Sequence, residues 1–240
     1  SSALKTSIIL VIAAFILVLY STFLNRSGIS GNASVHSFTD LGLSGQLLLY
    51  MGTFLLGAIG LSIYRWKDLP KDIKELGTYN REFWVFVGAA VLGLSAFQLT
   101  FTTSIPVYNK IAEAFGLLSN IALPADQAEH YSKIQIWIFV AVAILSGIGQ
   151  YVWWGKIKQS TSFKPLINPA LVATLLSVVF INIGKIYTIP YIILLWSGLF
   201  AVLANFKILW FLIREKFSLV GGAVAHVGLA IMLIGILFSA

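Results

Sequence analysis

Seven long apolar segments constrain this chain more than any other feature of its sequence. A hydrocarbon layer about 30 Å thick is crossed by roughly 20 residues of helix. Segments of about that length run over residues 7–24, 43–64, 83–105, 134–154, 169–185, 189–213 and 219–238. Charged residues make up only 10% of the chain, whereas about a quarter of a soluble domain is charged. We therefore expect an all-α fold, a polytopic membrane helical bundle of about seven transmembrane helices.

The basic residues are spread unevenly between the two sides that these segments would separate. If the chain begins in the cytoplasm, twelve of its 16 Lys and Arg residues fall on the cytoplasmic side. The other four are Arg26, Lys110, Lys133 and Lys185. Cytoplasmic loops carry an excess of Lys and Arg, so we expect a multi-pass protein of the bacterial inner membrane whose first loop faces the periplasm. The net charge of +7 then reflects topology and indicates no nucleic-acid partner.

No internal repeat or low-complexity tract divides the sequence, and we expect a single transmembrane domain over residues 1–240. Two longer connections are each expected to contain a short helix: one in residues 65–82, and an amphipathic one at the membrane surface over residues 109–118. The absence of cysteine excludes disulfide and thiol chemistry on this chain. Because it lacks an initiator Met and begins and ends in apolar runs, we expect a fragment of a larger protein.

His226 lies about eight residues into the last apolar segment. An ionisable residue inside a membrane helix is costly and marks a candidate functional site. Gly222, Ala223 and Ala230 lie three or four positions away on the same helix face. Such small side chains would let either a porphyrin or another helix backbone approach closely. The alternative is a neutral histidine that is hydrogen-bonded to a neighbouring helix, and the local pattern leaves both interpretations open.

His36 lies in a Gly-, Ser- and Asn-rich loop over residues 25–38, directly after the first apolar segment. Uncharged hydroxyl side chains surround it, which suits a neutral imidazole that ligates a metal or haem iron. Gly28 and Gly31 would let the backbone fold over a flat ligand, and Arg26 could pair with an anionic group such as a haem propionate. The alternatives are a solvated loop histidine and an arginine that anchors the membrane interface.

The remaining polar residues indicate no further site. His130 follows Glu129 in a connection predicted to be external, where we expect a solvated residue. No His-x-x-x-His, Glu-x-x-His or cysteine pair is present to hold a metal. The sequence also lacks a phosphate loop, a nucleophile elbow and an intramembrane carboxylate pair. Hydrolysis and proton-driven transport therefore have no visible machinery, and we predict no catalytic residue on this chain.

Two groups of residues within the apolar segments have structural interpretations. Amides are expected to form hydrogen bonds between helices; they are Gln46, Gln98, Gln150, Asn182 and Asn205. Tryptophans near the predicted membrane interfaces are expected to anchor the helices there; they are Trp84, Trp137, Trp153, Trp154 and Trp210.

Four elements of the sequence, taken in order, match the pattern of one known family. The loop Arg26-Ser-Gly … Ser-Val-His-Ser-Phe looks like a periplasmic histidine loop. Asn80-Arg-Glu-Phe looks like a Ser-Arg-Glu-Phe element, and Gly147-Ile-Gly with the residues up to Trp154 resembles a Gly-Ile-Gly-Pro segment. Gly221-Gly-Ala-Val-Ala-His-Val-Gly-Leu-Ala is similar to a late Ala-His-Leu-Gly element. In this order, across nearly the whole chain, the elements resemble those of the CcmF-type cytochrome c haem lyases.

The resemblance implies haem-handling roles for both candidate histidines. His36 would be one of two periplasmic histidines that hold haem in transit, and His226 one of two membrane histidines that ligate a resident haem b. In that family the delivered haem is joined by thioether bonds to the Cys-x-x-Cys-His motif of apocytochrome c. The implied partners are an amino-proximal half with a Trp-rich segment, a haem chaperone, apocytochrome c with its thiol-reducing partner, and the lipid bilayer.

The sequence departs from the family's pattern in ways that limit what the chain can do alone. The Trp-rich segment and the second histidine of each pair are absent, and the loop before His36 is about two residues longer than the pattern. The chain therefore resembles the carboxy-proximal half of such a protein, and we expect it to be inactive alone. Three functions stay open: part of a holocytochrome c synthase, a di-haem electron-transfer subunit, or a cofactor-free transporter or structural subunit.

Overall fold

Every regular element that the structure describes is helical. In a computed structural model of the chain, the described residues are 4–29, 42, 44–68, 81–118, 121–157 and 164–239. The helices are α1 (Leu4–Arg26), α2 (Ser44–Arg65), α3 (Arg81–Thr103), α4 (Ile105–Ala114), α5 (Gln127–Ile157), α6 (Ile167–Gly184), α7 (Ile189–Glu215) and α8 (Val220–Ser239), with two 3₁₀ turns, η1 (Lys164–Leu166) and η2 (Phe217–Leu219). These ranges contain no strand, so the all-α prediction is confirmed.

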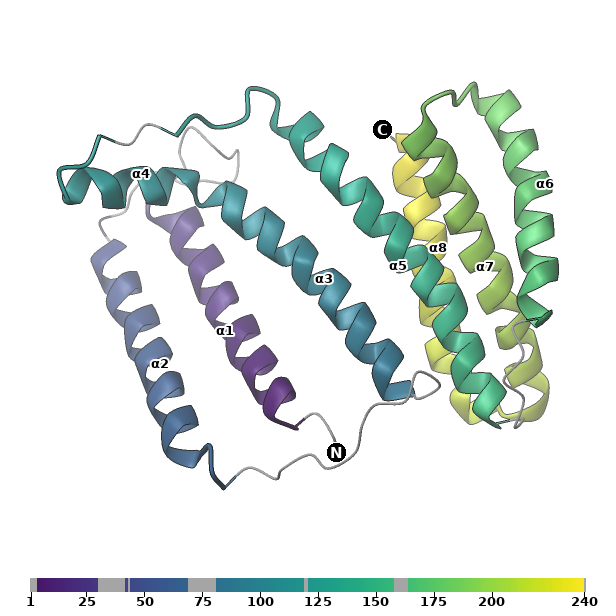
Figure 1. Cartoon of the computed structure of the whole chain (residues 1–240), viewed down its shortest axis with the longest axis horizontal. Coiled ribbons are helices and arrows are strands. Elements are labelled where there is room, and N and C mark those ends of the chain that lie inside the picture. Colours follow the sequence, from purple (N-terminus) through teal and green to yellow (C-terminus); the bar gives the residue numbers. More distant parts are fainter. Residues whose placement is uncertain are drawn as a thin grey trace. The chain divides into compact units, whose positions relative to one another are not determined.

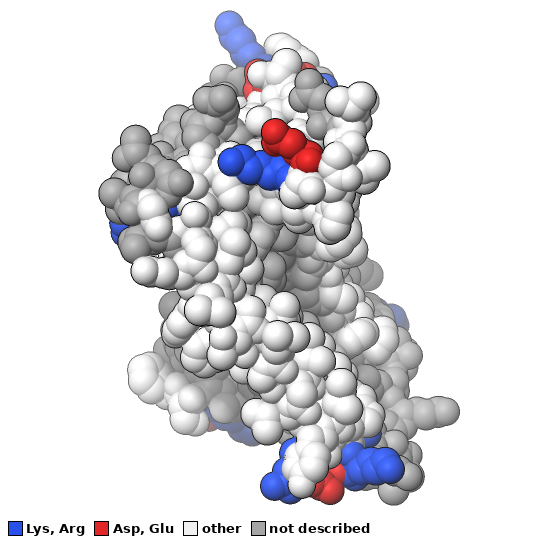
Figure 2. Space-filling view, turned by 90° about the vertical axis from the view of Figure 1, so that its left-hand side faces the viewer, with Lys and Arg blue, Asp and Glu red and all other residues white. Residues whose placement is uncertain are grey.

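Seven of the helices, all except α4, are long and apolar enough to cross a membrane. Each coincides with one of the seven predicted segments, so the polytopic architecture is confirmed. Figure 2 shows one face of the molecule, on which uncharged side chains cover most of the described surface and the few charged side chains lie in separate groups. A largely uncharged surface suits a hydrocarbon layer, because charged groups are costly inside it.

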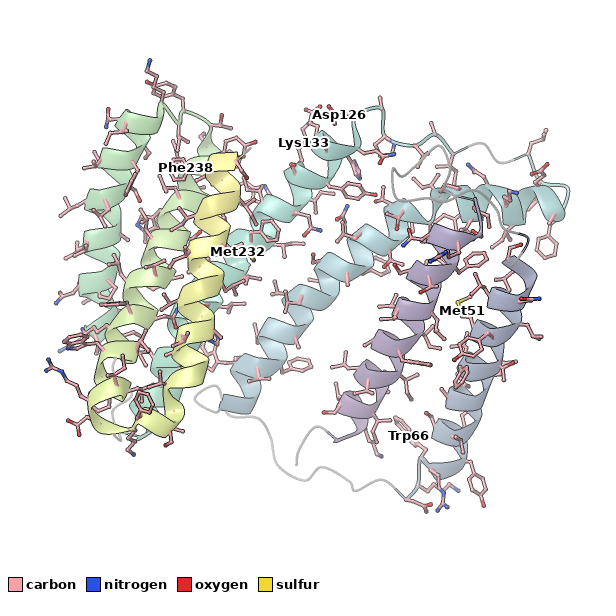
Figure 3. All side chains as sticks on the ribbon, turned by 180° about the vertical axis from the view of Figure 1, so that it is seen from behind. Met51, Trp66, Asp126, Lys133, Met232 and Phe238 are labelled. Atoms are coloured by element: carbon pink, nitrogen blue, oxygen red, sulfur yellow. The ribbon has the colours of Figure 1, made fainter. Side chains whose placement is uncertain are left out.

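Helix α5 begins at Gln127, before the apolar segment predicted to start at residue 134. The Glu129 N–H donates to the Asp126 carboxylate at 2.9 Å, as at a helix N-cap. Glu129 also pairs with Lys133 one turn later, with 2.7 Å between oxygen and nitrogen. Figure 3 shows Asp126 and Lys133 at this end of α5. Because polar residues cap and support the first turns, the helix extends beyond the apolar run that hydropathy detects.

The short helix expected over residues 109–118 is present as α4, displaced towards the amino terminus. Pro106 stands in its first turn, where the missing N–H and the fixed φ of proline are tolerated. Gly116, with φ of +70°, follows its end. The Asn109 side chain then holds the next connection, because it bonds both the N–H and the carbonyl of Ile121 at 3.0 Å. The helix expected in residues 65–82 falls mainly on residues 69–80, outside the described ranges.

The first of two compact units comprises Ser1–Glu75 and Thr100–Pro124. In this unit 1, α1 packs on α2, and the rings of Phe15 and Phe54 meet edge to face with centroids 5.4 Å apart. The Tyr20 hydroxyl donates to Ser104 Oγ at 2.6 Å, which ties α1 to the residue before α4. Helix α2 has no buried residue, so unit 1 has a small interior.

The second unit comprises Leu76–Leu99 and Ala125–Ala240. In this unit 2, α7 packs against α5, α6 and α8 (Figure 1). Buried small residues of α7 bring its neighbours close: a Cβ added to Gly198 would lie 2.8 Å from Ile234 Cγ1 and 3.9 Å from the Ala230 carbonyl oxygen, both on α8. The core of unit 2 therefore lies along α7. The single domain over residues 1–240 stays a prediction.

Helices α5 to α8 run in alternating directions along the chain (Figure 1). Lys164, Arg214 and Lys216 therefore lie at one end of unit 2, and Lys133 and Lys185 lie at the other. This grouping agrees with the alternation of sides that was assumed when the basic residues were assigned to the two sides of the membrane. Which end faces the cytoplasm stays a prediction, as does the side of the loop that carries His36.

Candidate functional site

His226 lies in the second turn of α8 and is half-buried. The small residues around it serve two purposes. Ala223 and Ala230 are each 1% exposed and belong to the packed core of unit 2. Gly222 is exposed and lines a cavity together with His226. The sequence left open whether these small residues admit another helix or a flat ligand. Ala223 and Ala230 pack against neighbouring helices, whereas Gly222 borders the cavity.

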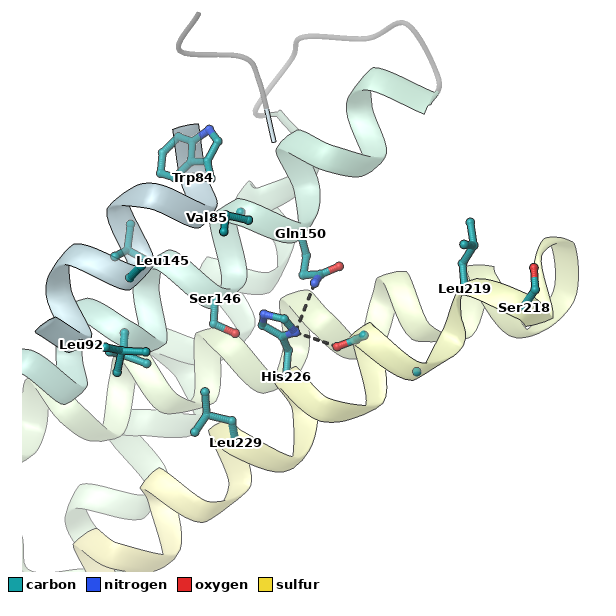
Figure 4. A pocket seen from close by; sticks show the side chains of 16 residues that line it. Trp84, Val85, Leu92, Leu145, Ser146, Gln150, Ser218, Leu219, His226 and Leu229 are labelled. Atoms are coloured by element: carbon teal, nitrogen blue, oxygen red, sulfur yellow. Dashed lines mark hydrogen bonds between the residues drawn. The ribbon is translucent and has the colours of Figure 1, made fainter. Parts of the chain in front are cut away.

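The cavity has a volume of about 730 Å³, is open on one side, and is lined by residues of α3, α5, η2 and α8 in unit 2. Its α3 wall includes Trp84, Gly88 and Leu92, and His226 faces them from α8 (Figure 4). Pockets for small molecules and cofactors occupy about 300–1,000 Å³ and are mostly apolar with a few polar groups. The cavity therefore has the size and the lining of a cofactor site.

The Nδ1 atom of His226 contacts two polar groups of the protein. It lies 2.6 Å from the Gly222 carbonyl oxygen, one helical turn earlier, and 3.2 Å from Nε2 of Gln150 on α5. A carbonyl oxygen can only accept, so the short contact with Gly222 places a hydrogen on Nδ1. Nε2 of a neutral ring then keeps its lone pair, on the opposite side of the imidazole from Gly222 (Figure 4). An imidazole held in this way can bind a metal ion.

Two glycines of the cavity wall leave room beside the imidazole. A Cβ added to Gly88 of α3 or to Gly221 of α8 would meet no other atom within 4 Å. The backbone at both positions is therefore accessible from the cavity, as close approach of a flat ring system requires. On the α5 wall, a Cβ added to Gly149 would lie 4.0 Å from the Trp84 Cβ, an ordinary van der Waals distance.

Comparison with curated proteins gives three relatives that carry one kind of name. Cytochrome c-type biogenesis protein CcmF of Escherichia coli (strain K12) is 27% identical over 241 residues, which cover 97% of this chain and 35% of the relative. CcmF of Haemophilus influenzae is 28% identical over 163 residues, or 67% of this chain and 24% of the relative. Cytochrome c-type biogenesis protein ccl1 of Rhodobacter capsulatus is 31% identical over 176 residues, or 72% and 25%.

This chain is a relative of the CcmF-type cytochrome c biogenesis proteins. The resemblance drawn from four short elements is thereby confirmed. The chain spans only about a quarter to a third of the length of these relatives, with values from 24% to 35%. No family model matches the chain, and no solved structure matches it.

Two of the four CcmF-type elements line the cavity, and so does the residue that follows a third. Trp84 directly follows Asn80-Arg-Glu-Phe, Gln150 follows Gly147-Ile-Gly, and His226 lies in the last element. These elements are distant in sequence and come from α3, α5 and α8. Their convergence on one space provides a structural reason for their joint occurrence in the sequence.

Sequence reasoning missed two of the residues at this site. Trp84 was expected to be an interface anchor, and its side chain lines the cavity. Gln150 was expected only to join two helices, which it does, and its partner is the candidate ligand His226. Both residues adjoin CcmF-type elements, and that adjacency is the signal that could have identified them.

The other intramembrane amides divide into two kinds. Gln135 links α5 to α3, because its amide donates to Gln98 Oε1 at 2.8 Å and accepts from Ser95 Oγ at 2.6 Å. Asn205, fully buried in α7, donates to Ser146 Oγ on α5 at 3.2 Å. For Asn182 the interhelical prediction was wrong, because its amide donates to Val178 of its own helix at 2.6 Å. The role of Gln46 stays a prediction.

Of the other candidate residues from the sequence, the structure describes Arg26 and His130 but not His36. His36 lies outside the described residues, so its role stays a prediction. Arg26 is the last residue of α1 and belongs to unit 1, whereas His226 belongs to unit 2. His130 lies in the first turn of α5, with its ring 5.5 Å from that of Tyr131. Within the described ranges, no group of three or more His, Asp or Glu residues could hold a metal ion.

Proposed function

We propose that this chain is part of a cytochrome c haem lyase of the bacterial inner membrane, and that His226 ligates its resident haem b. The observation that carries the proposal is the imidazole of His226, whose Nδ1 is 2.6 Å from the Gly222 carbonyl and whose other face borders a cavity of about 730 Å³. The printed names of the three relatives, all cytochrome c-type biogenesis proteins, supply the biological context.

The size and the donor chemistry of the cavity support a porphyrin as its ligand. Its volume lies within the range for cofactor pockets. Gly88 and Gly221 leave open backbone on two of its walls, and one neutral imidazole is a common axial ligand of haem iron. The described part of the chain offers one histidine at this cavity, so any second ligand would come from elsewhere in the assembly.

When bound, haem b supplies one-electron chemistry at its iron. The residues of this chain position it and control access. His226 presents Nε2 as the ligand, and Gly222 accepts the hydrogen of Nδ1, which fixes the tautomer. Apolar side chains of the wall, including Leu92 and Leu229, would surround the bound haem. An apolar surrounding of this kind would strengthen electrostatic interactions at the metal.

The haem that is delivered to apocytochrome c is the substrate of the proposed lyase. His36 would hold it at the periplasmic face, and Arg26 would pair with a propionate. The thiols that form the thioether bonds belong to apocytochrome c, since this chain has no cysteine. An amino-proximal half with a Trp-rich segment, a haem chaperone and the thiol-reducing partner would complete the complex.

Haem content separates this proposal from a cofactor-free membrane subunit. In the native membrane assembly, we expect His226→Ala to remove the resident haem while the chain still inserts, as measured by optical spectra and by immunoblotting of membranes. His130→Ala is the matched control, because that ring contacts Tyr131 at the start of α5 and lines no part of the cavity. Full haem content in the His226 variant would eliminate the ligand assignment.

A second experiment separates a lyase from a di-haem electron-transfer subunit. We expect His36→Ala to stop the formation of holocytochrome c while the resident haem remains. The readout is covalent haem on a reporter cytochrome, measured together with the optical spectrum of the membrane complex. Normal cytochrome maturation in this variant would favour the electron-transfer function.

A further inference from the structure

The two neighbours of His226 Nδ1 place opposite requirements on its protonation. The Gly222 carbonyl oxygen at 2.6 Å requires a hydrogen on Nδ1, whereas the Gln150 amide nitrogen at 3.2 Å could only donate to a bare Nδ1. In the same amide, Oε1 of Gln150 is buried and has no hydrogen-bond partner among the described atoms. The group that Nδ1–H could use as a second acceptor is thus turned away from it.

Exchanging the nitrogen and oxygen of the Gln150 amide gives Nδ1–H a second acceptor in place of a competing donor. The two atoms are nearly identical in size, so their assignment follows from the hydrogen bonds they make. Because Gly222 belongs to the same helix as His226 and lies one turn earlier, its carbonyl is fixed and can only accept. The amide has to adapt, and with Oε1 at 3.2 Å from Nδ1 it accepts a share of the same hydrogen.

We propose that Gln150 is a positioning residue for His226, and that its amide oxygen and the Gly222 carbonyl together hold the Nδ1–H of the imidazole so that Nε2 faces the cavity. This inference rests on the proposed function, in which Nε2 binds haem iron. Gly222 alone permits rotation about the side chain of His226. Gln150 comes from a different helix, so a second acceptor there fixes the plane of the ring relative to the α3 and α5 walls.

The second acceptor also alters the imidazole as a ligand. A hydrogen bond from the distal N–H of a metal-bound histidine raises the basicity of the ligating nitrogen. A more basic ligand favours the oxidised metal, so Gln150 lowers the midpoint potential of the bound iron. A carboxylate at the same position would accept more strongly than an amide and lower the potential further.

The test uses haem b in the native membrane assembly and three variants. Gln150→Met keeps the length of the side chain and removes the acceptor, and we expect about 10–100-fold weaker haem binding, as for other outer-sphere partners, with a higher midpoint potential. Gln150→Glu should retain haem and shift the potential below that of the wild type. Gln46→Met is the control, because Gln46 is an exposed residue of α2 and lines no part of the cavity.

The opposite shifts of the potential distinguish positioning from packing. If Gln150 only filled space, both variants would change haem retention without moving the potential in opposite directions, and the inference would fail. Haem binding and potential that stay at wild-type values in Gln150→Met would overturn it as well. Retention of haem in His226→Ala would instead remove the proposed function itself, so the two failures are distinguishable.

The tautomer can be measured without haem. This chain has three histidines, so if it alone is ¹⁵N-labelled at histidine and reconstituted with unlabelled partners and lipid, solid-state NMR has only three rings to assign. We expect His226 to carry its hydrogen on Nδ1 and to show an unprotonated Nε2. A hydrogen on Nε2 would overturn the inference whatever the haem content of the variants.

Discussion

Helices α2 and α7 are similarly apolar, and they are used in opposite ways. Half of the residues in the apolar stretch of α7 are buried inside unit 2, whereas no residue in the apolar stretch of α2 is buried. Both contain small residues, but those of α7 touch neighbours and those of α2 do not: a Cβ added to Gly45, Gly52, Gly57 or Gly60 would meet nothing within 4 Å. Hydropathy therefore predicts that a segment enters the membrane, and it does not predict which helix forms the core.

The difference in burial between α2 and α7 follows from the lipid that surrounds both helices. Lipid tails are as apolar as leucine side chains, so burial against another helix gains little hydrophobic free energy in a membrane. Close packing and interhelical hydrogen bonds decide instead. Helix α7 has both, through Gly198 against α8 and Asn205 against α5. We therefore expect unit 2 to hold its site rigidly, and substitutions in α7 to cost more than matched substitutions in α2.

The largest expected effect comes from emptying the core along α7. Leu195 is fully buried, and Leu195→Ala should lower the free energy of unfolding by about 2–5 kcal/mol, because the cavity left behind is filled poorly. Leu49→Ala in α2 should cost under about 0.5 kcal/mol, since that side chain is 74% exposed. Reversible unfolding in mixed micelles measures both, with hydrogen exchange to assign each loss to a unit. Equal losses would abolish the contrast between the helices.

The glycines give the next largest effect, with opposite signs in the two units. In Gly198→Ala the new methyl group would lie 2.8 Å from Ile234 Cγ1, so we expect a loss of about 1–3 kcal/mol from overpacking. Gly52→Ala meets open space and should stabilise α2 by about 0.5–1 kcal/mol through helix propensity. The same unfolding measurement applies. A destabilised Gly52→Ala variant would indicate that another molecule or chain packs on that face of α2.

A smaller effect is expected for the polar link behind the cavity. Asn205→Ala removes the bond to Ser146 Oγ at 3.2 Å and leaves a small void in α7. Interhelical hydrogen bonds in membranes contribute about 0.6 kcal/mol on average, so with the void we expect a loss of about 1–2 kcal/mol. Thr53→Ala in α2 should have almost no effect, because its hydroxyl bonds only the Leu49 carbonyl of the same helix. A loss above that of Leu195→Ala would show that this bond, rather than packing, dominates unit 2.

Sequence reasoning located the spans and one ligand candidate, and it failed where helix rotation matters. The apolar runs give the spans directly, and His226 was found because ionisable residues are rare in membrane helices. The polar first turns of α5 were missed because hydropathy does not register the cap formed by Asp126. Gln150 and Trp84 were assigned generic roles because uniformly apolar helices carry little signal of which face meets which neighbour. Their contribution depends on how α3 and α5 are rotated relative to α8.

The smallest expected effect tests the polar link of unit 1. Tyr20→Phe removes the hydrogen bond from the tyrosine hydroxyl to Ser104 Oγ at 2.6 Å. The Ser104 hydroxyl still donates to the Thr100 carbonyl, so no donor is left unsatisfied, and we expect a loss of about 0.5 kcal/mol. Hydrogen exchange in α1 and α4 measures it, with Thr22→Ala as a control because that hydroxyl bonds only Val18 of its own helix. A loss larger than that of Asn205→Ala would mean that unit 1, despite its small interior, depends more on its polar link than unit 2 does. The contrast between the units would then lie in packing alone and would not extend to their hydrogen bonds.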